Sequence, residues 1–273
     1  MEKLVGLLEA VKRRMGSAQY DSRVHPAESY YASIYMDYFK DHISRVYNHT
    51  DLKVFDAGCG TGRFSIPLAE MGCNVDAIDV HKDSLRIAKE SADRAGVQVS
   101  FTNGDLQREL EAVSDQVYDV VLSIETLYVC KAFKEILRDL CRVTKKDGLM
   151  FVTHRTPFFY ITQALRNNNY DDAVLVQKAS EGRLLKGMHR IYYNWQTSEE
   201  VDQLYRSIGA SIVRRYPIGP FSGFSSDAMS AICNTEEISK TQREKLRRIE
   251  ASTKVREETL MASRYVLVVA QVG

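Results

Sequence analysis

Three glycines at alternating positions follow a short apolar segment early in the chain. Residues 53–57 have the composition of a buried strand, and Gly58, Gly60 and Gly62 come directly after it, at the start of a helical segment. Glycine lets the backbone turn tightly and lets a ligand approach main-chain amides that a Cβ would shield. The pattern therefore predicts a ligand-binding turn between a strand and a helix.

Two acidic residues follow the next two predicted strands. Asp79 lies 19 residues after Gly60, at the end of the second strand, where a carboxylate can accept hydrogen bonds from both hydroxyls of a ribose. Asp105 follows the third strand, where it could meet the amino group of an adenine. Motifs at three successive strand ends together predict a site for a nucleoside-containing ligand.

The elements that position these residues alternate between short apolar runs and helices from residue 52 onward, which is typical of a parallel sheet built from strand–helix–strand units. Strands are predicted at 53–57, 74–78, 98–101, 119–124, 149–153, 210–216 and 264–270. Helices are predicted at 1–15, 27–47, 62–71, 83–95 and 133–143, after a capping box at 197–200 with Gly209 as the stop, and in a charged segment at 237–258.

The remaining segments predict the domain organisation. Residues 1–50 are expected to form a helical cap that precedes one domain at 51–273. Insertions at about 155–194 and 218–263 interrupt this domain after the fifth and sixth strands, at the strand ends where open α/β sheets bind ligands. They are predicted to cap a substrate.

With these motifs in place, the sequence resembles the class I S-adenosyl-L-methionine-dependent methyltransferases through the pattern Asp-x-Gly-x-Gly-x-Gly at residues 56–62. The resemblance covers residues 52–153 well, and 197–216 and the last strand more loosely. It implies a Rossmann-like α/β fold with a seven-stranded sheet whose last strand is antiparallel. It also implies S-adenosyl-L-methionine as cofactor and S-adenosyl-L-homocysteine (SAH) as product.

The resemblance also assigns cofactor-binding residues. The glycine turn and Asp56 would hold the methionine part, Asp79 the ribose and Asp105 the adenine. An N-terminal helical segment would fold over the cofactor, so that Tyr31 or a neighbour touches its carboxylate. The full implied set is Asp56, Gly58, Cys59, Gly60, Gly62, Asp79, Val80, Asp105, Leu106, Ser123 and Tyr31.

Catalytic residues are less clearly marked, because methyl transfer mainly requires an aligned nucleophile, and a general base only where the acceptor starts protonated. His154, at the end of the fifth strand, is the first candidate base, and His189, in the first insertion, is the second. Glu125 and Tyr128 follow the fourth strand and are candidates for contact with the substrate.

Composition and other motifs exclude several classes. The 37 Lys and Arg residues nearly balance 36 Asp and Glu, so no general attraction for nucleic acid or a membrane is expected. Neither a signal peptide nor an apolar run of about 18 residues is present, which predicts a cytoplasmic protein. Five scattered cysteines predict neither disulfides nor a metal site. Arg63 stands where a nicotinamide-binding turn has its third glycine, and no Asn-Pro-Pro-Tyr motif follows the fourth strand, as DNA methyltransferases of this fold would have.

The sequence therefore predicts a methyltransferase that acts on a nitrogen or oxygen of a small-molecule metabolite. A methyltransferase acting on RNA or protein stays open, as does a non-catalytic subunit that binds the cofactor. The charged segment at 237–258 interleaves acidic with basic residues and is expected to be a solvated helix. The chain could be a monomer or a homodimer.

Overall fold

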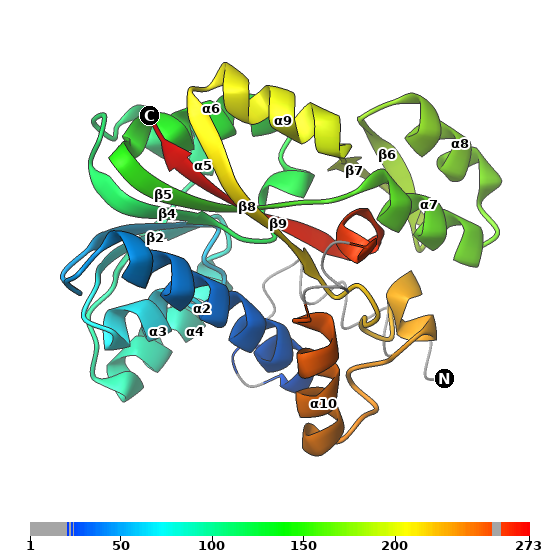
Figure 1. Cartoon of the computed structure of the whole chain (residues 1–273), viewed down its shortest axis with the longest axis horizontal. Helices are drawn as coiled ribbons and strands as arrows, with labels where there is room; N and C mark the ends of the chain where they lie inside the picture. Colours follow the sequence, from blue (N-terminus) through cyan, green and yellow to red (C-terminus); the bar gives the residue numbers. More distant parts are fainter. Residues whose placement is uncertain (1–20, 22, 24, 253–257) are drawn as a thin grey trace.

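Seven strands form the central sheet in the order β3-β2-β1-β4-β5-β9-β8 (Figure 1). The computed structural model describes residues 21, 23, 25–252 and 258–273, so the helix predicted at 1–15 lies outside the described residues. The strands are β1 Lys53–Ala57, β2 Asn74–Asp79, β3 Ser100–Asn103, β4 Tyr118–Ser123, β5 Thr144–His154, β8 Ala210–Ile218 and β9 Tyr265–Val272.

The sheet is parallel except at β9. Strand β1 pairs in parallel with β2 and β4, and β5 continues the parallel set beside β4. Strand β9 lies between β5 and β8 and runs antiparallel to both. Its residues 265–270 are all buried, as expected for a strand covered on both faces. The predicted fold class, including the antiparallel last strand, is confirmed.

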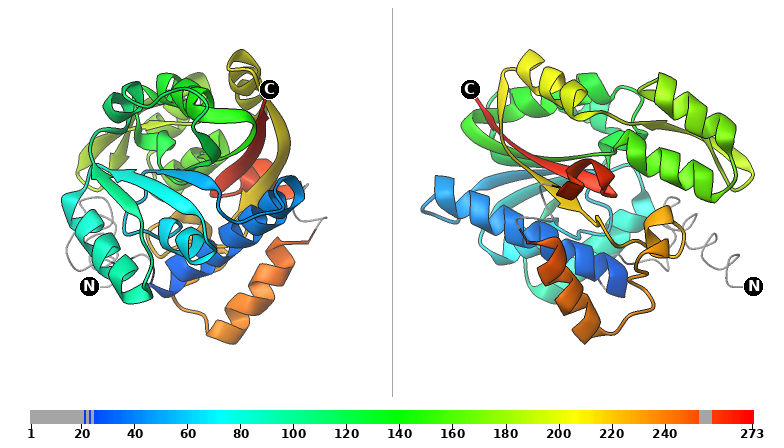
Figure 2. Two further views of the ribbon diagram at one scale, coloured as in Figure 1. Left: turned by 90° about the vertical axis from the view of Figure 1, so that its left-hand side faces the viewer. Right: turned by 45° about the vertical axis from the view of Figure 1, so that its right-hand side comes forward.

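Helices cover both faces of the sheet (Figure 2). One face carries α2 Pro26–Val46, α3 Ser65–Glu70 and α4 Lys82–Ala95, and the other carries α5 Leu106–Glu111, α6 Phe133–Val143 and α9 Ser198–Ser207. Alternation along β1 sends Val54 into the core on the α2 side and Phe55 into the core on the α6 side. Among the described residues, no helix is long and apolar enough to cross a membrane.

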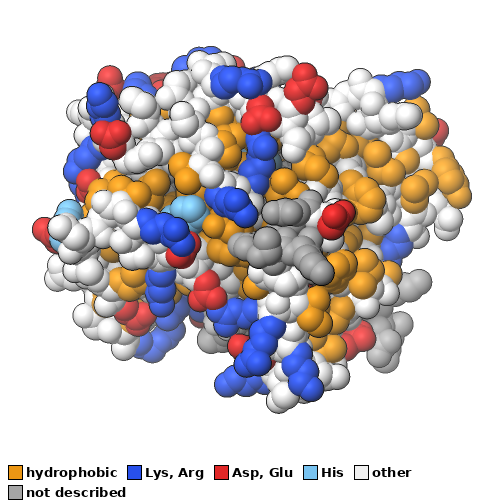
Figure 3. All heavy atoms as spheres, viewed as in Figure 1, with side chains coloured by type: hydrophobic (Ala, Val, Ile, Leu, Met, Phe, Trp, Pro, Cys, Tyr) orange, Lys and Arg blue, Asp and Glu red, His pale blue; other side chains and the backbone are white. Residues whose placement is uncertain are grey.

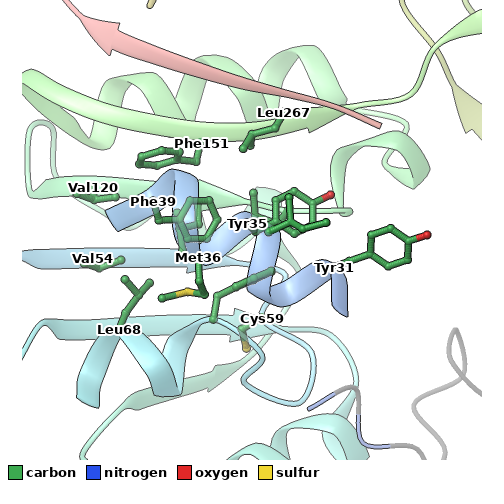
Figure 4. Packing of buried hydrophobic residues seen from close by; sticks show 14 of the residues in the cluster. Tyr31, Tyr35, Met36, Phe39, Val54, Cys59, Leu68, Val120, Phe151 and Leu267 are labelled. Carbon is green, nitrogen blue, oxygen red and sulfur yellow. The ribbon is translucent and has the colours of Figure 1, made fainter. Parts of the chain in front are cut away.

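Helix α2 is fixed to the sheet by aromatic packing. Figure 4 shows Phe39 projecting from α2 toward Phe151 of β5, and the two ring centroids are 4.8 Å apart. The ring of Phe64, just before α3, lies 5.3 Å from that of Phe39. All three side chains are buried. This cluster joins α2 to the same core as the sheet.

The first insertion forms a small unit of its own. It contains α7 Pro157–Arg166, α8 Tyr170–Lys178 and a separate antiparallel pair, β6 Glu181–Lys186 and β7 His189–Asn194. Trp195 and Tyr160 pack in its hydrophobic cluster with ring centroids 5.4 Å apart. Figure 3 shows hydrophobic side chains gathered over the part of the surface that α7 and α8 form. We name this unit, which consists of α7, α8, β6 and β7, the cap.

The second insertion is mostly irregular. It contains the short 3-10 segments Ala228–Ala231 and Leu260–Ala262 and the helix α10 Lys240–Glu250, which begins at a capping box. Helix α10 is shorter than the predicted 237–258. Arg247 of α10 forms an ion pair with Asp37 of α2, so this basic segment packs beside α2.

The other predicted elements agree with the structure to within three residues, except that β5 begins at Thr144, five residues before the predicted strand. Strand β1 and helix α6 have the predicted bounds, and the predicted box at Thr197 caps α9. Strand β3 is shifted toward Asn103, because it pairs in register with β2 from Asp76–Ser100 to Asp79–Asn103. The β6–β7 pair was not predicted, because its residues carry no clear alternation of apolar and polar side chains.

We expect Phe39→Ala to lower the free energy of unfolding by about 3 to 5 kcal/mol, because it removes a fully buried ring that joins α2, α3 and β5. Urea unfolding monitored by circular dichroism would measure the loss. Val46→Ala, at a residue that is 42% exposed near the end of the same helix, serves as the control and should change stability by less than about 0.5 kcal/mol. Equal losses in the two variants would contradict this account of how α2 is held.

Candidate functional site

A cavity of about 630 Å³ lies at the carboxyl ends of the parallel strands. Its walls come from the loops after β1, β4 and β5, from the start of β9, and from both insertions. The lining includes residues 58–61, Ile124, Glu125, Arg155 and Arg264. The cavity is therefore formed where the sequence predicts a ligand site, and residues of the first insertion line its other side.

The glycine turn after β1 contributes main-chain atoms to this cavity. The amides of Gly58 and Cys59 both donate to the carbonyl oxygen of Ile78 at 2.9 Å, which holds the turn against β2. Gly58 has a φ of +86°, and a Cβ there would lie 2.2 Å from Oγ1 of Thr126. Gly60 has a φ of +55°, and a Cβ there would meet no atom within 4 Å. Gly58 is thus required by packing, whereas the space beside Gly60 is open.

Asp79 fixes the same turn from the neighbouring strand. Its carboxylate accepts a hydrogen bond from the Gly60 amide at 2.8 Å and another from the His81 amide at 2.8 Å. Asp79 does not itself line the cavity, but it lies directly behind Gly60. The prediction that Asp79 and the glycine turn act together has a geometric basis in these bonds.

Several predicted cofactor residues lie behind the cavity rather than in its wall. Asp56 is buried and accepts a hydrogen bond from the Ser65 hydroxyl at 2.5 Å, and burial raises the pKa of its carboxyl to about 6. Gly62 packs against Ile66 of α3. Ser123 is fully buried. These residues shape the turn and the end of β4.

The predicted adenine side lies at the surface. Asp105 is exposed and caps α5 by accepting a hydrogen bond from the Arg108 amide at 3.2 Å. Leu106 is half-buried against the core on the α6 side, and Val80 is 60% exposed. Tyr31 is fully buried and donates to the Ser222 hydroxyl at 2.9 Å. None of these four side chains lines the cavity.

His154 does not fit the predicted role of a base. Its side chain is 3% exposed and does not line the cavity. One ring nitrogen lies 3.1 Å from Oε1 of Gln196, and the other lies 3.1 Å from the hydroxyl of Tyr205. Burial lowers the pKa of His154 to about 4. The position of His154 at a strand end predicted that it would line the cavity. Its side chain instead points to the α9 side of the sheet.

His189 also lies outside the cavity. It is the first residue of β7 and is exposed near the tip of the β6–β7 pair. Lys186 and Gly187 of that tip do line the cavity, so the prediction reached the right segment but not a lining residue. Among the described residues that line the cavity, none is a histidine.

Glu125 and Tyr128 do line the cavity, beside the end of β4. Glu125 has a φ of +56°, and its amide donates to Oγ1 of Thr153 at 2.6 Å. Its carboxylate accepts a hydrogen bond from the Tyr35 hydroxyl at 3.1 Å and lies 3.5 Å from a guanidinium nitrogen of Arg63. These contacts fix the carboxylate in the wall between the glycine turn and α2.

Three arginines of the wall were not among the predicted site residues. Arg63 forms an ion pair with Glu28 of α2 at 2.6 Å, and both side chains are at most 10% exposed. Arg155 directly follows β5, and Arg264 directly precedes β9. Since β5 and β9 are antiparallel neighbours, these two arginines meet at the same edge of the sheet. The positions of Arg155 and Arg264 at strand ends were the sequence signal that could have identified these two residues.

Comparisons with known proteins identify the family. The sequence model of a family described as a methyltransferase domain matches residues 48–207, more than half of the chain. The chain belongs to this methyltransferase-domain family. The resemblance seen in the sequence is thus confirmed. The matched residues include the glycine turn, Glu125 and Arg155.

Individual relatives are distant. A ubiquinone biosynthesis O-methyltransferase from Rickettsia felis is 30% identical over 131 residues, which are 47% of this chain and 52% of that protein. The chain spans about half the length of the curated relatives it matches.

Solved structures show the methyltransferase fold over nearly the whole chain. Magnesium protoporphyrin IX methyltransferase from Synechocystis PCC 6803, solved with bound SAH, has a TM-score of 0.59 at 15% identity and covers 97% of this chain and 94% of its own. The cyclase SpnF has a TM-score of 0.54 at 14% identity and covers 99% of this chain and 94% of its own. Proteins with different named reactions therefore share this fold.

The buried position of His154 predicts a pH-dependent stability. The pKa of His154 is about 4 when folded and near 6.5 when unfolded, so between these values the unfolded chain binds more protons and stability falls as the pH falls. From about pH 7 to about pH 5.5 this contribution is about 1 kcal/mol.

Urea unfolding at the two pH values should therefore show the wild type losing about 1 kcal/mol more than His154→Gln does. The comparison cancels other titrating groups, such as Asp56, that both proteins share. Identical losses would mean that His154 titrates normally in the folded protein.

Proposed function

We propose that this chain is an S-adenosyl-L-methionine-dependent methyltransferase that acts on an oxygen or nitrogen of a small-molecule acceptor. The observation that carries the proposal is one continuous cavity that joins the glycine turn to the cap. A methyl donor and an acceptor must lie in the same closed space for an in-line transfer, and alignment alone can supply about 7 to 11 kcal/mol. The family match supports a methyltransferase, and the O-methyltransferase named among the relatives favours oxygen as the acceptor atom.

The residues of the turn fit the methionine and ribose parts of such a donor. The open space at Gly60 lets a ligand approach the main chain there, which a side chain would prevent. Each carboxylate oxygen of Asp79 accepts one protein hydrogen bond and retains a further lone pair for a ribose hydroxyl. Asp105 and Leu106 would meet the adenine at the outer edge. When bound, the donor supplies a methyl group that is already activated by its sulfonium.

The chain's own part in the reaction is to hold the acceptor and exclude water. Tyr128 stacks on Tyr193 of the cap with ring centroids 6.2 Å apart and planes within 3°, so the cap and the end of β4 form one aromatic wall. Glu125 offers a carboxylate in that wall and would receive a proton from a protonated acceptor. His154 has no place in this proposal.

A nucleic-acid acceptor fits the described residues less well. The basic helix α10 interleaves its arginines with acidic residues, and Arg247 is paired with Asp37. Residues of the cap also form part of the cavity wall, so a long polymer would have to pass beside them. A non-catalytic role would leave a cavity with space for an acceptor unexplained.

Incubation of the purified protein with methyl-labelled S-adenosyl-L-methionine and an extract of its source organism would test the proposal. We expect label in the small-molecule fraction. Label in the RNA or protein fraction would show methyltransferase activity, but on a macromolecule instead of a small-molecule acceptor. No transfer to any fraction, together with intact binding of SAH, would favour a non-catalytic cofactor-binding protein.

Gly60→Ala would test the cofactor assignment. The methyl group would occupy the open space beside the turn, so SAH affinity should fall at least about ten-fold, which is about 1.4 kcal/mol. The positive φ should cost about 1 kcal/mol of stability.

Gly96→Ala is a matched control, because Gly96 also has a positive φ of +68° with open space around it, but it caps α4 away from the cavity. It should lose the same stability and bind SAH normally. Calorimetry and thermal unfolding give the two readouts, and unchanged SAH affinity in Gly60→Ala would remove the turn from the cofactor site.

A further inference from the structure

Two buried arginines lie side by side in the wall of the cavity. Arg155 and Arg264 are 6% and 3% exposed, although both line the cavity. Nη1 of Arg155 donates to the carbonyl oxygen of Arg264 at 2.7 Å, which joins the two residues across the β5–β9 edge. They form what we name the arginine pair.

The arginine pair has hydrogen-bond donors without acceptors. Within the described part of the chain, Nε of Arg155 and Nη1 of Arg264 are buried and have no hydrogen-bond partner. A buried N–H of a charged group without a partner is strongly unfavourable, so these two donors need an acceptor that the described residues do not supply.

Among the described residues, only Arg264 of the arginine pair has a carboxylate within 4.0 Å. Nε of Arg264 donates to the carboxylate of Asp227 at 2.7 Å. No described carboxylate lies within 4.0 Å of Arg155, while Glu28 and Glu125 are engaged by Arg63. Arg155 is therefore the member of the pair without a directly paired carboxylate, and a negatively charged group of a ligand would supply one.

Aromatic rings restrict the shape of that ligand. The guanidinium carbon of Arg155 lies 3.8 Å from the ring centroid of Phe159 and 3.6 Å from that of Tyr265, and that of Arg264 lies 4.2 Å from the centroid of Phe224. Such short contacts are those of a guanidinium stacked on ring faces, which leaves only its N–H edges for a ligand. A planar carboxylate is the group that fits these edges.

We propose that the methyl acceptor is an organic acid whose carboxylate binds the arginine pair. The inference rests on the proposed function and names its substrate class. Phe159 and Phe224 come from the two insertions, whereas the glycine turn, where the methyl donor would lie, has Arg63 beside it. Because Phe159 belongs to the cap, which is predicted to cover the substrate, we assign the carboxylate at the arginine pair to the acceptor. Tyr128, Tyr160 and Tyr193 would face its apolar body.

The carboxylate anchors the acceptor and is not itself methylated, because hydrogen bonds and two cationic groups reduce its nucleophilicity. A second oxygen or nitrogen of the acceptor forms the new bond to the methyl carbon. The sulfur–methyl bond breaks and leaves its electron pair on sulfur, and the proton of the acceptor passes to Glu125 or to water. The product therefore keeps one negative charge on its carboxylate.

The charge of the labelled product tests this directly. Small molecules labelled in the extract assay are separated by anion exchange at neutral pH and treated with mild alkali. We expect the labelled product to be retained, to contain no phosphate by mass, and to keep its label in alkali. A neutral product, a phosphorylated product, or methanol released from a methyl ester would overturn the inference while leaving the proposed function intact. Label found only in RNA or protein would instead show that the proposed function had failed.

Variants of Arg155 test whether the arginine pair binds the acidic acceptor. Arg155→Gln should lower the rate of labelling of the acidic product at least about ten-fold, with SAH affinity unchanged. Arg155→Lys keeps the positive charge but lacks the planar guanidinium, so it should retain part of the labelling rate. It also provides the test if Arg155→Gln does not fold. A fall in SAH affinity equal to the fall in rate would assign the arginine pair to the donor and overturn the inference.

Arg215→Gln is the matched control. Arg215 is paired with Asp202 at 2.5 Å and also has a buried Nε without a partner in the described structure, but it does not line the cavity. It should leave labelling within about two-fold of the wild type. An equal loss in Arg155→Gln and Arg215→Gln would mean that losing a buried arginine, rather than losing the carboxylate site, lowers the rate.

Discussion

The ion pair between Arg63 and Glu28 joins the three segments on which the cavity depends. Arg63 follows the glycine turn, Glu28 lies on α2, and Arg63 also reaches Glu125 after β4. Removing one partner of a buried pair leaves an uncompensated charge, which commonly costs about 3 to 5 kcal/mol. Helix α2 therefore cannot leave the sheet without exposing both its aromatic contacts and this charge. Its position sets the wall that Glu125 and Tyr35 share.

Local sequence patterns predicted the parts of the molecule that local forces determine. Strand β1 and helix α6 have the predicted bounds because their apolar residues repeat with one clear period and their ends are marked. The glycine turn was predicted because few structures require glycines at that spacing, and Gly58 proves to have no room for a side chain.

Contacts between distant residues explain what the sequence could not predict. His154 and Arg155 are adjacent, yet alternation along the chain sends one into the core beside Tyr205 and the other into the cavity wall. No pattern reveals which face a strand end will present until its neighbours are known. Arg155 and Arg264 are 109 residues apart in sequence and meet only through the antiparallel pairing of β5 and β9. For the same reason the β6–β7 pair, whose partners are set by the cap, was not predicted.

The place of β9 has a consequence for how the protein is made. Strand β9 is among the last parts of the described chain to be synthesised, yet it lies inside the sheet, between β5 and β8. Until residues 265–272 leave the ribosome, β5 has an unpaired edge, β8 has no partner strand in the sheet, and the apolar faces that β9 completes stay open to water. Unpaired edges of this kind are templates for pairing with other chains. A nascent chain of this protein should therefore be most prone to aggregation just before synthesis of β9 ends, and this is the stage at which chaperone binding would matter most.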